Sequence, residues 1–89
     1  DMVKRKLDHK IAAPGALGTA LQEAFPDGAR NQLDGEKFIW KDQWVQVRAS
    51  GTEPVVRIIA EAPTSARAED LVTRAADAAT RSQSAGISA

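Results

Sequence analysis

QWVQVRASGTEPVVRIIAEA, which runs from Gln43 to Ala62, is the stretch that decides the fold of this 89-residue chain. It holds two runs of strand-forming residues, Gln43–Ala49 and Val55–Ala62, on either side of a polar connection. The connection contains Ser, Gly, Thr and Pro, which are common in turns. The stretch therefore predicts two strands joined by a short loop.

The loop between these strands carries residues that suit an anion. Arg48 and Arg57 stand near its two ends, and each guanidinium is a planar fork of donors that matches phosphate oxygens. Ser50 and Thr52 add hydroxyl donors, and Gly51 lets backbone N–H groups approach a ligand without a side chain in the way. These residues indicate a site for a phosphate group.

An ordinary turn between strands accounts for the same residues. In that interpretation Arg48 and Arg57 are solvated, each in a weak surface ion pair with Glu53 or Glu61. Glu53 fits better as a support for a guanidinium, or as part of the turn, than as a general base. Local chemistry alone leaves the phosphate site and the plain turn both open.

The N-terminal part of the chain predicts a strand followed by a helix. A period-2 pattern favours a strand over Val3–Ile11. Pro14 suits the first position of a helix, and Leu17, Leu21 and Phe25 recur at helical spacing after it. Together with the elements that follow, this predicts an α+β domain in the order β-α-β(4)-α.

Short strands near Asn31–Leu33 and Glu36–Lys41 are expected between the helix and the central stretch. The Asp34-Gly35 turn is a hairpin signal, so neighbouring strands should be antiparallel. Beyond Pro63 an apolar stripe predicts a second helix. We predict one domain over residues 1–81 and a flexible tail over residues 82–89.

Length and composition limit the classes of function. The chain is long enough for one modest core, and its formal net charge of +0 gives no overall attraction to nucleic acid or to an anionic membrane. It lacks cysteine, which excludes thiol catalysis, and it lacks an 18-residue apolar run. With no secretion signal in its sequence, we expect a cytoplasmic location.

The ten residues Arg48–Arg57 resemble the C-terminal phosphate-binding loop of the α-D-phosphohexomutases, the family of phosphoglucomutase, phosphomannomutase and phosphoglucosamine mutase. The resemblance extends over roughly residues 33–75, since Leu33–Trp40 and Trp44–Val47 look like the strands before that loop and Ile58–Ala62 like the strand after it. It implies a TATA-box-binding-protein-like fold, in which both helices cover one face of an antiparallel-rich sheet. Such a likeness of fold carries no implication of DNA binding.

The resemblance also implies a role within a larger enzyme. Phosphohexomutases move phosphate between the 1 and 6 positions of a hexose phosphate through a phosphoserine and a bisphosphorylated intermediate. Their fourth domain holds the phosphate that is not reacting. By this likeness the binding residues are Arg48, Ser50, Gly51, Thr52 and Arg57, with Glu53 in support.

Three motifs of the same family are absent from this chain. It has no nucleophilic serine loop, no Asp-x-Asp-x-Asp motif for magnesium and no Glu-x-Ser-Gly sugar-selecting loop. We therefore expect no catalytic residue and no metal ligand here, and predict that the chain alone is inactive, whereas magnesium is expected in the parent enzyme. The expected partners are a hexose phosphate and the other domains of the parent, without nucleic acid or membrane.

A different class of function is suggested by the basic run Lys4-Arg5-Lys6. It favours a non-catalytic interaction or nucleic-acid-binding module that uses the first strand. Against this alternative, aromatic residues make up only 4% of the chain, and it contains no nucleic-acid-binding motif.

Overall fold

Residues 1–8, 14–49 and 55–84 are described by a computed structural model, and they have the predicted order of elements. The structure confirms the α+β class. The strands and helices, in chain order, are β1 (Met2–Leu7), α1 (Pro14–Ala24), β2 (Ala29–Asn31), β3 (Glu36–Ile39), β4 (Trp44–Ala49), β5 (Val56–Glu61) and α2 (Ser65–Ser84).

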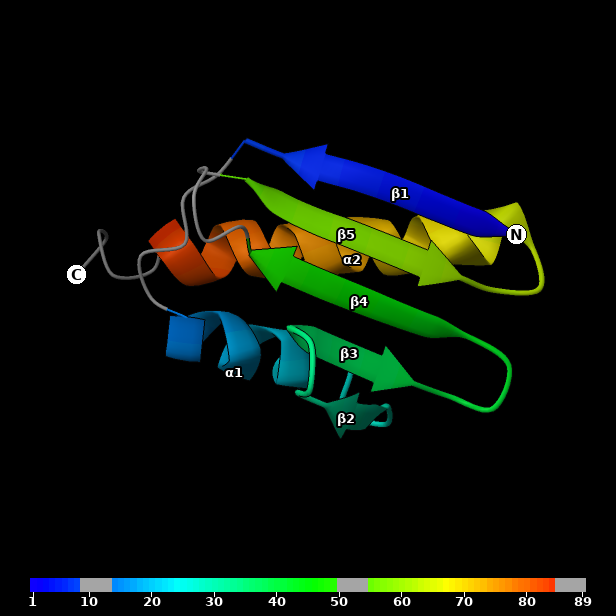
Figure 1. The fold of residues 1–89 in the computed structure, drawn as a ribbon, viewed down its shortest axis with the longest axis horizontal. Coiled ribbons are helices and arrows are strands. Elements are labelled where there is room, and N and C mark those ends of the chain that lie inside the picture. The colour runs from blue at the N-terminus through cyan, green and yellow to red at the C-terminus, as the bar shows by residue number, and fades with distance from the viewer. Residues whose placement is uncertain (9–13, 50–54, 85–89) are drawn as a thin grey trace.

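The strands form one antiparallel sheet in the order β1-β5-β4-β3-β2. Figure 1 shows both helices behind this sheet, with its other face turned toward the viewer. The β1 strand lies beside β5 although the two are far apart in the sequence. We call the side of the described sheet that neither helix covers the open face.

Strand periodicity decides which side chains are buried between the sheet and the helices. Val45 and Val47 of β4 are buried, whereas Trp44, Gln46 and Arg48 point to the open face. The helices contribute the opposite wall of the core. The largest fully buried side chains of the whole core are Phe25, Phe38, Leu21, Ile58, Val45, Val47, Val56 and Val72.

Local signals account for where both helices begin. Pro14 is the first residue of α1, as the sequence predicts. Thr64 caps α2, because its Oγ1 accepts a hydrogen bond from the backbone N–H of Arg67 at 3.2 Å. The Nη2 of Arg74 donates to the carbonyl of Ala24 at 2.7 Å, which ties α2 to the end of α1.

All five predicted strands have different limits in the structure, and β3, β4 and β5 differ from the predictions by only one or two residues at an end. The strand predicted over Val3–Ile11 ends at Leu7, where its pairing with β5 stops, and residues 9–11 lie outside the described residues. The strand predicted at Asn31–Leu33 is instead Ala29–Asn31. Asn31 Oδ1 accepts a hydrogen bond from the N–H of Leu33 at 2.9 Å, and this local turn ends the strand.

The C-terminal helix is longer than predicted. It includes residues 82–84, which the small polar composition had suggested as tail. Ser82 is buried, and its hydroxyl donates to the carbonyl of Ala79 at 2.8 Å, so a polar residue completes the last turns without leaving an unpaired group. The division into a domain and a tail stays a prediction.

Candidate functional site

The two arginines that flank the predicted phosphate loop lie directly opposite each other. Arg48 of β4 pairs in register with Arg57 of β5, and both side chains are exposed on the open face. Directly opposed residues have Cβ atoms about 4.5–5.5 Å apart. Both arginines are therefore able to contact one small ligand.

The remaining predicted site residues, Ser50, Gly51, Thr52 and Glu53, lie outside the described residues. The strand ends that flank them are described. Figure 1 shows that the C-terminal ends of β1 and β4 and the N-terminal end of β5 meet at one end of the sheet. Arg48 and Arg57 lie at this end, which we call the loop end.

The sequence did not predict the carboxylate that pairs with Arg48. The Nε of Arg48 lies 3.1 Å from Oδ1 of Asp34. The Arg48 side chain is 57% exposed and the Asp34 side chain 65%. The plain-turn interpretation offered Glu53 or Glu61 as the partner. Glu61 is opposite Trp44, at the other end of β4 from Arg48, so the alternative pair between Arg48 and Glu61 is wrong. The hairpin signal at Asp34-Gly35 was the available clue.

The turn that holds Asp34 is fitted closely against β4. Gly35 has φ of 72°, and a Cβ added to it would lie 2.5 Å from the carbonyl oxygen of Val47 and 3.0 Å from Cγ of Arg48. Gln46 Nε2 donates to the carbonyl of Asp34 at 2.7 Å. These contacts require glycine and fix the carboxylate beside Arg48.

A second polar cluster, formed by residues of β2, β3 and α1, has a structural role. Arg30 donates from Nε and Nη2 to the two carboxylate oxygens of Glu36 at 2.8 and 3.1 Å, and from Nη1 to Gln22 at 3.0 Å. The hydrogen bond to Glu36 raises the pKa of Arg30. The bidentate pair links β2 to β3, and the hydrogen bond to Gln22 joins the sheet to α1.

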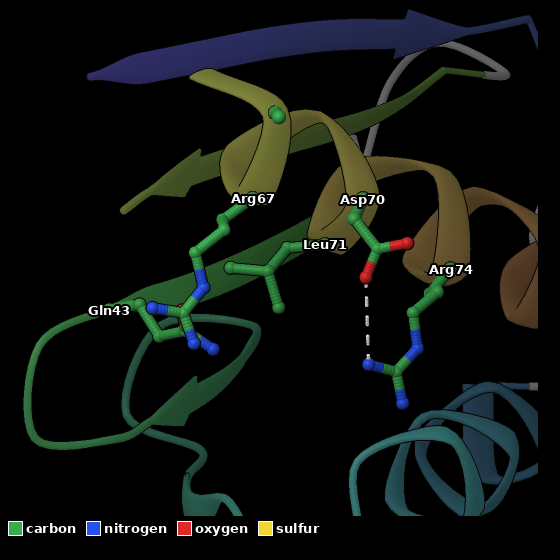
Figure 2. Close-up of a pocket in the computed structure, with 6 residues that line it drawn as sticks. Gln43, Arg67, Asp70, Leu71 and Arg74 are labelled. Atoms are coloured by element: carbon green, nitrogen blue, oxygen red, sulfur yellow. Dashed lines mark ion pairs between the residues drawn. The ribbon is translucent and has the colours of Figure 1, made fainter. Parts of the chain in front are cut away.

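A groove of about 300 Å³ lies between the start of α2 and the turn from β3 to β4 (Figure 2). Its two arginines already have partners. Arg67 pairs with Asp42 at 3.7 Å, and Arg74 pairs with Asp70 at 3.8 Å, the contact dashed in Figure 2. By contrast, Arg57 has no ion pair with any described residue, which makes the loop end the better anion site.

Two further properties bear on the class of site. Within residues 1–8, 14–49 and 55–84, no group of three or more His, Asp or Glu side chains is arranged to hold a metal ion. In the same ranges, neither helix is both long and apolar enough to cross a bilayer.

A comparison with known protein families matches most of the chain. Residues 2–78 match the family described as phosphoglucomutase/phosphomannomutase, C-terminal domain. Among curated proteins, the phosphoglucomutase/phosphomannomutase of Thermococcus kodakarensis is 54% identical over 37 residues, which are 42% of this chain and 8% of that protein. The phosphoglucosamine/phosphogalactosamine mutase of Sulfurisphaera tokodaii is 55% identical over 40 residues, which are 45% of this chain and 9% of that protein.

A longer match is to the protein named "Probable phosphoglucosamine mutase" of Pyrococcus abyssi. It is 46% identical over 68 residues, which are 76% of this chain and 15% of that protein. The chain thus matches between 8% and 15% of the length of these three relatives.

Proposed function

The chain belongs to the phosphoglucomutase/phosphomannomutase C-terminal domain family, and we propose that it binds a phosphate group of a hexose phosphate as part of a larger phosphohexomutase. The observation that carries this proposal is the direct opposition of Arg48 and Arg57 at the loop end. Like charges placed directly opposite each other across strands destabilise a sheet. A bound phosphate offsets that repulsion.

Charge and exposure both favour a phosphate over a structural role for this pair. Asp34 neutralises one guanidinium, and no carboxylate among the described residues pairs with the other. A phosphate monoester carries about −1.5 to −2 charges near pH 7, and arginine forks match its oxygens. We assign the backbone and hydroxyl contacts to Ser50, Gly51 and Thr52, with Glu53 in support.

In the parent enzyme this contact would act by positioning. Phosphate would move between the 1 and 6 positions of the sugar through a phosphoserine and a bisphosphorylated intermediate, in domains outside this chain. Binding energy gathered at the non-reacting phosphate orients the sugar and favours closure of the cleft. Magnesium would likewise be bound elsewhere in the parent, which we propose is cytoplasmic, and the chain alone would not turn over substrate.

This role does not select the sugar. The names of the relatives include glucose, mannose, glucosamine and galactosamine enzymes, and a phosphate group is common to all of their substrates. Contacts made to the phosphate alone discriminate poorly between hexoses. We therefore propose a hexose phosphate as the ligand class.

The test is an NMR titration of the 89-residue chain with inorganic phosphate and with glucose 6-phosphate. We expect a Kd of about 1 mM, near 4 kcal/mol, because the other domains contribute no contacts. Hydrogen bonds to charged groups contribute about 1.5–3 kcal/mol, so Arg57→Gln should weaken binding at least about tenfold.

Arg67→Gln is the matched control, since it removes the same charge from an exposed site in the groove of Figure 2. It should leave the affinity for phosphate unchanged. Equal losses in the two variants, or wild-type affinity in Arg57→Gln, would contradict the proposed site.

A further inference from the structure

A third cation continues the line of Arg48 and Arg57 across the sheet. Lys6 of β1 is directly opposite Arg57, which is directly opposite Arg48. All three side chains are exposed on the open face. The sheet therefore carries one transverse row of three cations at the loop end, which we call the cation row.

Positive charge is concentrated on the open face and is balanced elsewhere. The charged residues of β1, β3, β4 and β5 that point to this face are five cations and one carboxylate, namely Lys4, Lys6, Lys37, Arg48, Arg57 and Glu61. On α2, by contrast, three arginines are matched by three acids, namely Arg67, Arg74, Arg81, Glu69, Asp70 and Asp77. With an overall formal charge of +0, the chain separates its charges instead of mixing them on this face.

A hollow of about 320 Å³ lies between β1 and β5 at this place. Lys4, Lys6 and Arg57 contribute to its lining, and none of the three makes an ion pair with a described residue. Ile59 adds an apolar wall from the same face. The hollow therefore has room for a ligand, and beside Arg57 it carries positive charge that no described carboxylate pairs.

The charges of the cation row balance those of a phosphate. Among the described residues, Lys6, Arg57 and Arg48 supply three positive charges, and the pairing of Arg48 with Asp34 removes one, which leaves two. A phosphate monoester approaches two negative charges near pH 7. With only the two arginines, the remaining charge would be one, and half of the dianion would stay unmatched.

The ammonium group of Lys6 is also able to reach a phosphate bound at Arg57. Neighbouring strands lie about 4.8 Å apart, and the lysine ammonium sits on a flexible four-carbon stem. A phosphate above Arg57 is therefore within range of Lys6 from one side and of Arg48 from the other. The arginines would give directional hydrogen bonds, while Lys6 would act as a mobile point charge.

We propose that Lys6 is a third cationic ligand of the phosphate that Arg48 and Arg57 bind, so that β1 forms part of the site. This inference rests on the proposed function. It extends that site to a strand far from the loop in sequence, and it gives the basic run Lys4-Arg5-Lys6 a role other than nucleic-acid binding. Arg5 is not included, because it points to the covered side, where it lies 3.9 Å from Glu69.

The experiment compares Lys6→Gln with Lys41→Gln by NMR titration with inorganic phosphate and with glucose 6-phosphate. Lys41 lies in the turn from β3 to β4, at the other end of the sheet, and is exposed. Exposed charge pairs contribute modestly, so Lys6→Gln should raise the Kd about two- to fivefold and Lys41→Gln less than twofold. Lys6→Arg should keep the wild-type affinity.

A second readout separates direct contact from a structural effect. The ε-methylene signals of Lys6 in the wild-type chain should shift during the titration, in step with the amide signals of Arg57. The amide spectrum of each variant without ligand checks that it is folded.

The inference and the proposed function fail in different ways. If Arg57→Gln loses phosphate while Lys6→Gln binds normally and the Lys6 signals stay still, the inference is wrong and the proposed function stands. If the wild-type chain does not respond to phosphate, both are wrong. The inference would also be overturned if the chain bound a short single-stranded oligonucleotide more tightly than glucose 6-phosphate at 0.15 M salt. The cation row would then be a binding site for phosphodiesters.

Discussion

Replacing Gly35 by alanine tests how the turn between β2 and β3 supports the site. The residue has φ of 72°, which costs a non-glycine residue about 1 kcal/mol. Its new Cβ would lie 2.5 Å from the carbonyl oxygen of Val47, a backbone atom that is held in the sheet. Overpacking of this kind costs about 1–3 kcal/mol, so Gly35→Ala should destabilise the chain by about 2–4 kcal/mol.

Urea denaturation of the two proteins at 25 °C measures this difference. Gly15→Ala is the matched control, since apart from its chain neighbours and the backbone of its own helix no heavy atom lies within 4 Å of the added Cβ, and the residue is in α1. Alanine there should be neutral or stabilising by up to about 1 kcal/mol. A loss below about 0.5 kcal/mol for Gly35→Ala would refute the close fit of the turn. In a variant that remains folded, phosphate affinity should also fall, because the new Cβ crowds Arg48 Cγ.

Two further predictions concern the helices. Arg74→Ala should cost about 1–2 kcal/mol in thermal or urea unfolding, because it leaves the carbonyl of Ala24 without its donor and removes the cation from the face of Phe25, 5.0 Å away. Arg67→Ala, which breaks only an exposed pair, should cost less than about 0.5 kcal/mol; similar losses in the two variants would contradict the role given to Arg74. Thr64→Ala should cost about 1 kcal/mol through loss of the α2 cap, while Thr64→Ser should restore stability.

Elements with strong periodic or capping signals could be predicted from the sequence. The alternation of apolar and polar residues around Val45 and Val47 matches the two faces of β4, and Pro14 gave the correct start of α1. The three-residue strand β2 is too short to show a period, and the side chain of Asn31 ends it by a local hydrogen bond. Composition also misled at Ser82, since its hydroxyl is satisfied inside the helix.

The site was predictable only where it depended on local order. Counting along the strands predicted that Arg48 and Arg57 stand near one loop, and the register shows that they are directly opposed. Asp34 was missed because its contact with Arg48 depends on the packing of a turn against a strand two elements away along the chain. The alignment of Lys6 with the arginines requires the pairing of β1 with β5, which periodicity does not specify.

The most direct test of the central claim is to locate the ligand on the labelled wild-type chain. Amide signals are followed while glucose 6-phosphate is added to several times the expected millimolar Kd. We predict saturable shifts centred on residues 47–58, with smaller ones at the Asp34-Gly35 turn. Shifts centred instead on the groove between Arg67 and Arg74, or shifts that rise linearly without saturation, would contradict a phosphate site at the loop end.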